Sequence, residues 1–399
     1  MAIRTLDDLD VEGTSVGVRV DINSPLADDG GLADDARLRA HVDTLSELLD
    51  RGGRVTILAH QGRPGGSEFE PLESHATRLD ELLDAPVMYS DATCSAGARN
   101  AIDALEPGQA LLLENTRFYS EEYMEFDPPT AARTHLVDRL APHFEAFVND
   151  AFAAAHRSQP SLVGFAHRLD AYAGRVMERE IDVLGHVEDT PEPRAYVVGG
   201  AKVPDAIDII RHGIETGQAT HVLTAGLVAN VFLFASDVDL GDETAEYILE
   251  KDYWDQIDRA AELLQAHGEH IHLPTDVAVR RGGAREEVPI ESMPTPENGD
   301  VKDVGHETVA AYEEVLSDVG TAILNGPAGV FEDPDFQYGT RALFQAVADA
   351  KYSIVGGGDT ARAIRKFDLG GFDHVSTGGG AALNMLTGGE LPAIDALDP

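Results

Sequence analysis

The chain has 399 residues, of which 43% are hydrophobic, and it carries a formal net charge of −41 at pH 7. This length favours two to three domains, and no uninterrupted apolar run approaches the ~20 residues that span a bilayer. The charge excludes nucleic acid and anionic membranes as main partners, because both are themselves negatively charged.

The acidic residues are spread along the whole chain, whereas only five of its 30 cationic residues are lysines. Such a surface repels itself in dilute salt, and the repulsion is screened at ~1 M salt, where the Debye length is ~3 Å. The composition therefore resembles that of cytosolic proteins from salt-accumulating halophiles, with an acidic mesophile protein as the alternative. Because no secretory signal is visible and Cys94 is the only cysteine, we expect a cytoplasmic protein without intrachain disulfides.

Four apolar segments in the first half are predicted strands that end in polar or cationic residues. They occupy residues 16–23, 54–63, 110–117 and 146–157. Helical patterns such as residues 38–52 and 134–143 separate them, so this half alternates between strand and helix. We expect it to form one lobe over residues 1–168.

A long helical pattern follows, with apolar residues at helical spacing from Tyr172 to Leu184. We predict an interdomain helix over residues 169–188. The segment Glu188–Arg194 contains two prolines and ends this helix. A second lobe then begins at residue 189.

Six apolar segments of the second half run into glycines or a turn. They occupy residues 195–202, 221–227, 271–277, 321–329, 352–360 and 374–382. The polar, Pro- and Gly-rich stretch 280–300 is predicted to be a surface excursion. The whole pattern predicts an α/β fold of two Rossmann-like lobes, each a mostly parallel sheet flanked by helices, joined by the interdomain helix.

Cations of the first lobe follow predicted strand ends, which is where ligands bind in open α/β sheets. The planar guanidinium of arginine forms bidentate hydrogen bonds with carboxylate and phosphate. One such arginine is usually a surface ion pair, but five cations together indicate a site for a small polyanion: Arg37, His60, Arg63, Arg117 and Arg157. Asp21 and Asn23 either hold substrate hydroxyls or cap a turn.

The second lobe repeats a unit made of a strand, a glycine turn and a helix start, as in residues 355–364 and 376–386. Glycine lets backbone N–H groups approach phosphate oxygens, and a helix N-terminus favours negative charge. Asp359 is placed for a magnesium ion and Thr360 for a phosphate oxygen. Lys202 follows a strand and a Gly pair, which favours a phosphate contact over a neutral helix start. No P-loop or dinucleotide fingerprint occurs.

Together these segments resemble phosphoglycerate kinase, and the match runs in order through essentially the whole chain. The motifs that carry the resemblance are RVDINSP, ADDARLRAHVDTL, HQGRP, LLLENTRF, VNDAFAAAHR, GGAKVPD, LPTDV, ILNGPAGVFE, VGGGDTARAI and STGGGAALNMLTGGELP. The chain departs from the family pattern at Ala206, where a second lysine is usual, and at Gln159, which replaces a histidine. The turn at residues 224–230 has a single glycine.

The resemblance implies that the first lobe binds 3-phosphoglycerate and the second binds ADP or ATP with Mg²⁺. The substrate-binding residues that it implies are Asp21, Asn23, Arg37, His60, Arg63, Arg117 and Arg157. The nucleotide-binding residues that it implies are Gly200, Lys202, Gly226, Asn325, Glu332, Gly356, Gly357, Gly358, Asp359 and Thr360, with Asp359 as the metal ligand. Arg37 and Lys202 are implied to be the catalytic cations that neutralise the phosphoryl group during transfer.

The implied reaction belongs to glycolysis and gluconeogenesis: 1,3-bisphosphoglycerate and ADP are reversibly converted to 3-phosphoglycerate and ATP. The family transfers the phosphoryl group directly and in line, in a closed interdomain cleft. The acceptor carboxylate is already ionised at neutral pH, so catalysis needs positioning and charge stabilisation but no general base. The resemblance also implies a monomer with hinge closure, a second lobe over 189–384 and a C-terminal tail, residues 385–399, that returns to the first lobe.

Two other classes of function compete with this hypothesis. A two-lobed protein that binds an anionic metabolite without catalysis would leave the glycine-rich wall unused. A nicotinamide-dependent oxidoreductase would be expected to carry the dinucleotide fingerprint, which the chain lacks. A kinase acting on 3-phosphoglycerate is therefore the leading hypothesis.

Overall fold

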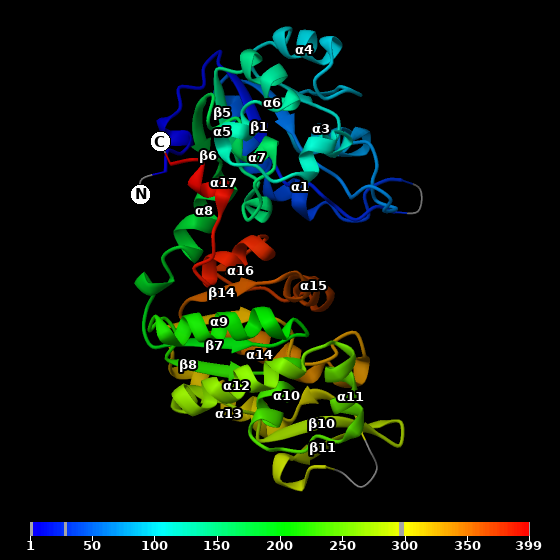
Figure 1. The fold of residues 1–399 in the computed structure, drawn as a ribbon, viewed down its shortest axis with the longest axis vertical. Coiled ribbons are helices and arrows are strands. Elements are labelled where there is room, and N and C mark those ends of the chain that lie inside the picture. Colours follow the sequence, from blue (N-terminus) through cyan, green and yellow to red (C-terminus); the bar gives the residue numbers. More distant parts are fainter. Residues whose placement is uncertain (1–2, 28–29, 295–298, 399) are drawn as a thin grey trace. The chain divides into compact units, whose positions relative to one another are not determined.

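The computed structural model describes residues 3–27, 30–294 and 299–398. The chain forms two compact units (Figure 1): unit 1 is Met1–Asp182 with Glu390–Pro399, and unit 2 is Val183–Gly389. In the C-terminal segment, the Ala393 N–H donates to the Ala155 carbonyl at 3.1 Å, within unit 1. The last residue of the predicted tail, Pro399, lies outside the described residues.

Unit 1 is built on a six-stranded sheet with the order β3-β4-β2-β1-β5-β6, in which every pair is parallel. Its strands are β1 Ser15–Arg19, β2 Arg54–Leu58, β3 Val87–Tyr89, β4 Gln109–Leu112, β5 Ala146–Asn149 and β6 Asp170–Ala173. Its helices are α1 Ala36–Ala40, α2 Val42–Asp50, α3 Glu73–Leu82, α4 Ala96–Asp103, α5 Pro128–Ala131, α6 His135–Leu140, α7 Pro160–Val163, α8 Arg175–Leu184 and α17 Pro392–Asp395. The α8 helix crosses the division between the units.

The predicted helix over residues 169–188 is wrong in its first part. Asp170–Ala173 form the edge strand β6, which pairs with β5, and α8 starts only at Arg175. Gly174 lies between the strand and the helix. A larger residue would not fit there, because a Cβ would lie 2.2 Å from Asp150 Oδ1. Tyr172 fits the apolar spacing of a helix, but the side chain is buried in the core that includes Val16 and Val148. Burial against the sheet therefore decides the conformation of this short segment.

Unit 2 contains a second parallel six-stranded sheet, with the order β15-β14-β13-β7-β8-β9. Its strands are β7 Arg194–Val198, β8 His221–Thr224, β9 Ile271–His272, β13 Thr321–Asn325, β14 Ser353–Gly356 and β15 His374–Val375. Its helices are α9 Val203–Glu215, α10 Gly226–Ala235, α11 Asp242–Glu250, α12 Trp254–His267, α13 His306–Asp318, α14 Tyr338–Ala348, α15 Gly358–Phe367 and α16 Gly380–Leu386.

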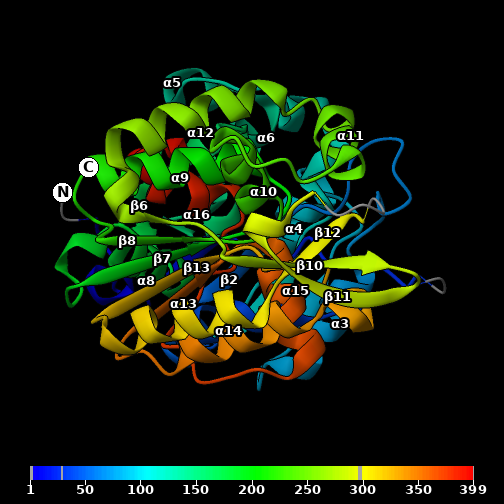
Figure 2. The ribbon, with the colours of Figure 1, turned by 90° about the horizontal axis from the view of Figure 1, so that it is seen from below.

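The helices of unit 2 lie on both faces of its sheet. Figure 2 shows α9 and α12 on one face and α13 and α14 on the opposite face. The central strands are buried along their length, as is usual for parallel sheets that are covered on both sides. The two sheets flanked by helices confirm the predicted α/β class. Within the described part of the chain, no helix combines the length and apolar character needed to cross a bilayer.

The stretch 280–300, predicted to be a surface excursion, contains the strand β11 of a small antiparallel sheet. The sheet has the order β11-β10-β12, with β10 Asp276–Arg281, β11 Ala284–Pro289 and β12 Val301–Val304. Gly282 and Gly283, both with positive φ, form the two-residue turn of the β10–β11 hairpin. Val288 of β11 packs into a separate small core with Val277 and Val279 of β10, whereas the other residues of β11 are exposed or half-buried, as expected for a surface segment. Residues 295–298 of the predicted excursion lie outside the described residues.

Candidate active site

A cluster of cationic side chains forms at the carboxyl edge of the unit 1 sheet. Arg19 ends β1 and is buried, and its Nη2 donates to Nδ1 of His60, beyond β2, at 2.7 Å. Arg117 follows β4 in the short 3₁₀ helix Thr116–Phe118 and donates to the Gly62 carbonyl at 2.6 Å. Parallel strands end at one edge of the sheet, which explains why residues so distant in sequence meet.

Burial and the repulsion between neighbouring positive charges lower the pKa values of the arginines in this cluster. The pKa of Arg117 is lowered to about 10, first by burial and then by the charges of Arg157, Arg19 and Arg63. The pKa of Arg157 is also lowered, mainly by burial, with further contributions from Arg63 and Arg37. A bound anion would remove this repulsion, so the cluster is electrostatically prepared for a polyanion.

The Asp21 carboxylate lies within this cluster and is only 7% exposed. It forms an ion pair with Nη1 of Arg37, which lies on α1. Burial alone would raise the pKa of Asp21, but the charges of Arg37 and Arg19 outweigh that effect and hold the pKa well below its usual range. Asp21 is therefore an ionised acceptor surrounded by donors, a combination that suits substrate hydroxyls.

His60 is a neutral donor in this environment. Burial, followed by the charge of Arg19, lowers the pKa of His60 well below its usual value. Because Arg19 donates to Nδ1, the ring proton is on Nε2, which is left as a hydrogen-bond donor.

The remaining predicted residues of unit 1 belong to the same region. Asn23 Oδ1 accepts a hydrogen bond from the Gly62 N–H at 2.9 Å, so Asn23 ties the segment after β1 to the segment after β2. Arg63 is exposed, and Arg157 is half-buried with its Nε 3.1 Å from Nε2 of His156. The structure thus brings all seven predicted substrate-binding residues to one edge of the sheet.

Arg19 is a member of the cluster that sequence reasoning missed. It lies inside a strand, and its Nε donates to Ser161 Oγ at 2.9 Å, while Ser161 donates to the buried Glu122 at 2.6 Å. Its position in the RVDINSP motif was visible, but its burial and its contact with His60 were not.

The glycine turns of unit 2 line a small cavity. The lining residues include Gly200, Lys202, Asn325, Gly357, Gly358, Asp359, Thr360 and Gly379. Gly326 shows why glycine is needed, since a Cβ there would lie 2.3 Å from the Gly199 carbonyl oxygen. Thr360 Oγ1 accepts from the Gly326 N–H at 2.9 Å, so this buried hydroxyl also supports the turn. Helix N-termini and free N–H groups around a cavity suit phosphate.

Lys202 lies at this cavity as the residue that precedes α9, and its side chain is exposed. Within residues 3–27, 30–294 and 299–398, no ion pair or hydrogen bond is found for its ammonium group. Ala206, one helical turn later, is only 2% exposed and packs into the unit. A cation at that position would therefore have to leave the core to reach a ligand.

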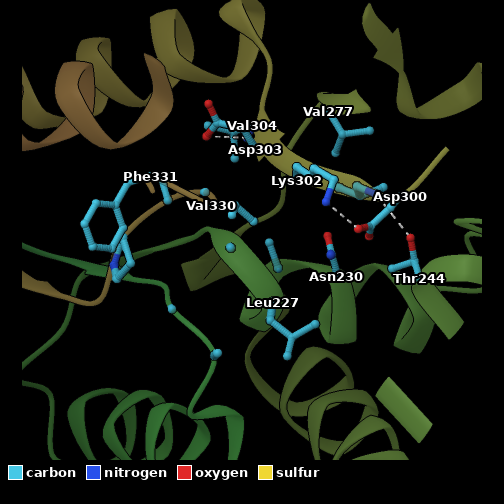
Figure 3. A pocket seen from close by; sticks show the side chains of 18 of the residues that line it. Leu227, Asn230, Thr244, Val277, Asp300, Lys302, Asp303, Val304, Val330 and Phe331 are labelled. Atoms are coloured by element: carbon cyan, nitrogen blue, oxygen red, sulfur yellow. Dashed lines mark hydrogen bonds and ion pairs between the residues drawn. The ribbon is translucent and has the colours of Figure 1, made fainter. Parts of the chain in front are cut away.

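A larger cavity of about 400 Å³ adjoins the glycine turns (Figure 3). Its apolar lining includes Leu227 from α10, Val277 from β10 and Val330 with Phe331 from the segment after β13. Gly200, Ala201, Pro327 and Asp359 line both cavities, so the two are continuous along one wall. An apolar cavity joined to a phosphate-binding turn has the form of a nucleotide site.

Polar groups gather at one end of the larger cavity. The Lys302 ammonium forms an ion pair with Asp300 at 2.9 Å, and Asn230 and Thr244 lie near this pair in Figure 3. None of these residues was predicted from the sequence. Lys302 is one of only five lysines in the chain, and that scarcity is the only signal that could have singled it out.

Asp303, next to Lys302, holds the wall of this cavity together. Its carboxylate forms an ion pair with Arg285 of β11 at 2.8 Å and accepts from the Gly339 N–H of α14 at 3.0 Å. A Cβ at Gly329 would lie 2.4 Å from Asp303 Oδ1, so the segment after β13 packs directly against it. Burial, partly opposed by Arg285, raises the pKa of Asp303 to about 6.

The other predicted nucleotide residues occupy different places. Gly226 and Glu332 line the larger cavity, and Glu332 forms an ion pair with Arg362, whose guanidinium lies 5.2 Å from the Phe331 ring centre. Gly356 lines neither cavity and is buried as the last residue of β14, where it is in register with Asn325. Gly356 therefore supports the turn from within the sheet.

Asp359 is the residue that fits a divalent cation. It opens α15 beside the glycine turn, is about half exposed, and lies 3.5 Å from Arg362. The described residues contain no group of three or more His, Cys, Asp or Glu side chains that could hold a metal ion. One carboxylate next to a phosphate site nevertheless suits Mg²⁺, which is usually bound by one or two carboxylates together with substrate phosphates.

Comparisons with known proteins agree with this arrangement. A family model described as phosphoglycerate kinase matches residues 6–389. The chain is 62% identical over 397 residues to a phosphoglycerate kinase of Halobacterium salinarum, with 100% of both chains covered. It is 61% identical to that of Natronomonas pharaonis, with 99% of both covered. The crystal structure of phosphoglycerate kinase from Pyrococcus horikoshii OT3 superposes with a TM-score of 0.91 at 38% identity, covering 99% of this chain and 98% of that one.

Proposed function

The chain belongs to the phosphoglycerate kinase family, and from this premise we propose how its two sites divide the two substrates. It is a phosphotransferase with a carboxyl group as acceptor, and its reaction is the reversible conversion of 1,3-bisphosphoglycerate and ADP to 3-phosphoglycerate and ATP. The family assignment argues against the two alternative functions, a non-catalytic binding protein and an oxidoreductase.

In this proposal 3-phosphoglycerate binds to the cationic cluster of unit 1. The observation that carries the proposal is the gathering of arginine side chains and His60 around the buried Asp21 carboxylate at one edge of the sheet. The phosphate and carboxylate of the substrate would be bound by guanidinium groups and by Nε2 of His60. The Asp21 carboxylate would accept a hydrogen bond from the substrate hydroxyl group, and the Asn23 amide NH₂ would donate one to it. The full set proposed is Asp21, Asn23, Arg37, His60, Arg63, Arg117 and Arg157.

The nucleotide binds to unit 2 in this proposal, with its base in the cavity of about 400 Å³ and its phosphates at the glycine turns. Lys202 and Thr360 would contact phosphate oxygens, and Asn325 would line the same cavity. Asp359 would hold Mg²⁺ there. When bound, Mg²⁺ supplies charge that neutralises phosphate oxygens.

The chemical step is proposed to be direct, in-line transfer after the two units close on their substrates. The attacking carboxylate needs no base, so the protein contributes positioning and the stabilisation of charge. Arg37 and Lys202 are proposed to neutralise the phosphoryl group during transfer. Arg37 belongs to unit 1 and Lys202 to unit 2, so in this proposal both cations reach the phosphoryl group only after the two units close.

A coupled turnover assay with 3-phosphoglycerate, ATP and Mg²⁺ in molar KCl tests the proposal. We expect saturable turnover that depends on all three components and disappears with EDTA. A folded protein, verified by circular dichroism in the same buffer, that shows no turnover would refute it. Sedimentation of the active protein checks the further proposal that it works as a monomer.

A further inference from the structure

A buried histidine outside the cationic cluster contacts the backbone of Asp21. His41 lies between α1 and α2 and is only 3% exposed. Its Nε2 lies 3.1 Å from the Asp21 backbone nitrogen and 3.2 Å from the Asp21 carbonyl oxygen. The last backbone hydrogen bond from β1 to β2 is donated by the Val20 N–H to the Leu58 carbonyl at 3.1 Å. The next N–H, that of Asp21, donates to the His41 ring, which extends the support of the backbone to Asp21.

The other ring nitrogen of His41 is tied to a carboxylate that is itself fixed. His41 Nδ1 lies 2.6 Å from Asp150 Oδ2. The second oxygen, Asp150 Oδ1, accepts from the N–H groups of Val176 and Met177 in the first turn of α8, at 2.9 and 3.3 Å. Asp150 has no room to move toward Gly174, where even a Cβ would lie 2.2 Å from it.

These contacts determine the tautomer of His41. An ionised carboxylate only accepts hydrogen bonds, so Nδ1 carries the proton that is donated to Asp150. In the neutral ring Nε2 is then an acceptor, and it receives the Asp21 N–H. The line of hydrogen bonds runs from the start of α8 through Asp150 and His41 to Asp21, whose side chain holds Arg37.

We propose that His41 is a positioning residue for substrate binding in unit 1. It touches no reacting atom, and it acts by fixing the backbone of Asp21 so that the Asp21 carboxylate and Arg37 keep their places. This inference rests on the proposed binding of 3-phosphoglycerate to unit 1. The role requires the Nδ1-protonated ring, so it depends on Asp150 as well as on His41.

Two near-isosteric substitutions and their combination test the inference. In His41→Asn the amide replaces Nδ1 and keeps the contact with Asp150 but cannot reach Asp21. In Asp150→Asn the new amide NH₂ can donate to His41 Nδ1 and shift the ring proton to Nε2, while the amide oxygen can still accept from the N–H groups of Val176 and Met177. Leu45→Val, in the buried face of α2, is the control for a general loss of stability.

We expect each single variant to raise the KM for 3-phosphoglycerate about tenfold, as for loss of one buried hydrogen bond, with the KM for ATP within twofold of the wild type. The double variant should be no worse than the single variants, because both break one linkage. Leu45→Val should change neither KM. These KM values, and the 3-phosphoglycerate Kd by calorimetry, would be measured in the same molar KCl buffer.

Three outcomes would overturn the role of His41: an unchanged KM for 3-phosphoglycerate, an equal rise in both KM values, or additive effects in the double variant. If His41→Asn does not fold, Asp150→Asn alone shows whether the KM for 3-phosphoglycerate rises while the KM for ATP does not. A wild-type protein without turnover would instead refute the proposed function, so the two failures are distinguishable.

Discussion

At the scale of single residues, Arg37 and Lys202 are more exposed than the buried cations Arg19 and Arg117. The Arg37 side chain is 39% exposed with Asp21 as its ion-pair partner, and Lys202 is an exposed residue that lines the smaller cavity of unit 2. Arg19 and Arg117, in contrast, are buried and hydrogen-bonded to the protein. Side chains with freedom to reorient suit a group that changes position during transfer.

Alanine at either position should therefore lower kcat more than it raises KM. We expect kcat to fall by about 10² or more for Arg37→Ala and for Lys202→Ala, as when one transition-state donor is removed. Lys351→Ala, an exposed lysine that lines neither cavity, is the matched control and should leave both constants unchanged. Steady-state kinetics that showed only KM effects would contradict the assigned roles.

Lys302 makes a different prediction because it lines the larger cavity. Lys302→Ala should raise the KM for the nucleotide about tenfold with little change in kcat, since the contact is the same in ground and transition states. Lys302→Met should raise it less, because the apolar stem that lines the cavity is kept. An unchanged nucleotide KM in the alanine variant would show that the base does not bind beside Lys302.

The sequence predicted which residues lie together where polar or cationic residues follow a strand end. Asp21, His60 and Arg117 could be placed together because parallel strands share one carboxyl edge. Arg19 and Lys302 could not, since their roles depend on burial and on neighbours that are distant in sequence.

At the scale of elements, most strands were predictable from apolar segments that run into polar residues or glycines, whereas β6 and the β10–β11 hairpin were not. The edge strand β6 was read as helix because Tyr172 fits helical spacing. The β10–β11 hairpin was not predicted within the surface excursion 280–300, although the Gly282–Gly283 pair between alternating residues is a hairpin signal. Missing this hairpin also hid the cavity that it helps to line.

The small sheet and the cavity wall meet at Asp303, which gives a pH-dependent prediction. Burial raises the pKa of Asp303 to about 6, above the value of an unfolded aspartate. The folded state therefore binds more protons between those two values, and the contribution of Asp303 to stability falls as pH rises through about 6. From pH 5 to pH 7 we expect wild type to lose about 1 kcal/mol relative to Asp303→Asn.

Chemical denaturation of both proteins at several pH values in molar KCl measures this difference. Comparing the two proteins at each pH cancels the titration of the other carboxylates. A difference in unfolding free energy that is constant with pH would contradict the raised pKa of Asp303.

At the scale of the whole molecule, the net charge of −41 is the main source of electrostatic repulsion in the folded protein. The described ion pairs are mostly exposed, and exposed pairs contribute little individually. Repulsion among the excess carboxylates is therefore balanced mainly by burial of the core and by screening from dissolved salt.

We accordingly expect the melting temperature and the activity to rise together as KCl is increased from about 0.1 M to molar concentrations. Calorimetry and turnover over the same salt series measure the two effects. A melting temperature that is independent of salt would show that the surface charge does not limit stability.

The division of two substrates between two units is the central claim, and calorimetric titration of each ligand into site variants tests it most directly. Arg157→Ala should weaken 3-phosphoglycerate binding at least about tenfold, the expected cost of one charged contact, and leave Mg²⁺–ADP binding within twofold of the wild type. Asp359→Asn should show the reverse. Loss of both ligands in either variant, or of the opposite ligand, would contradict the assignment of one substrate to each unit.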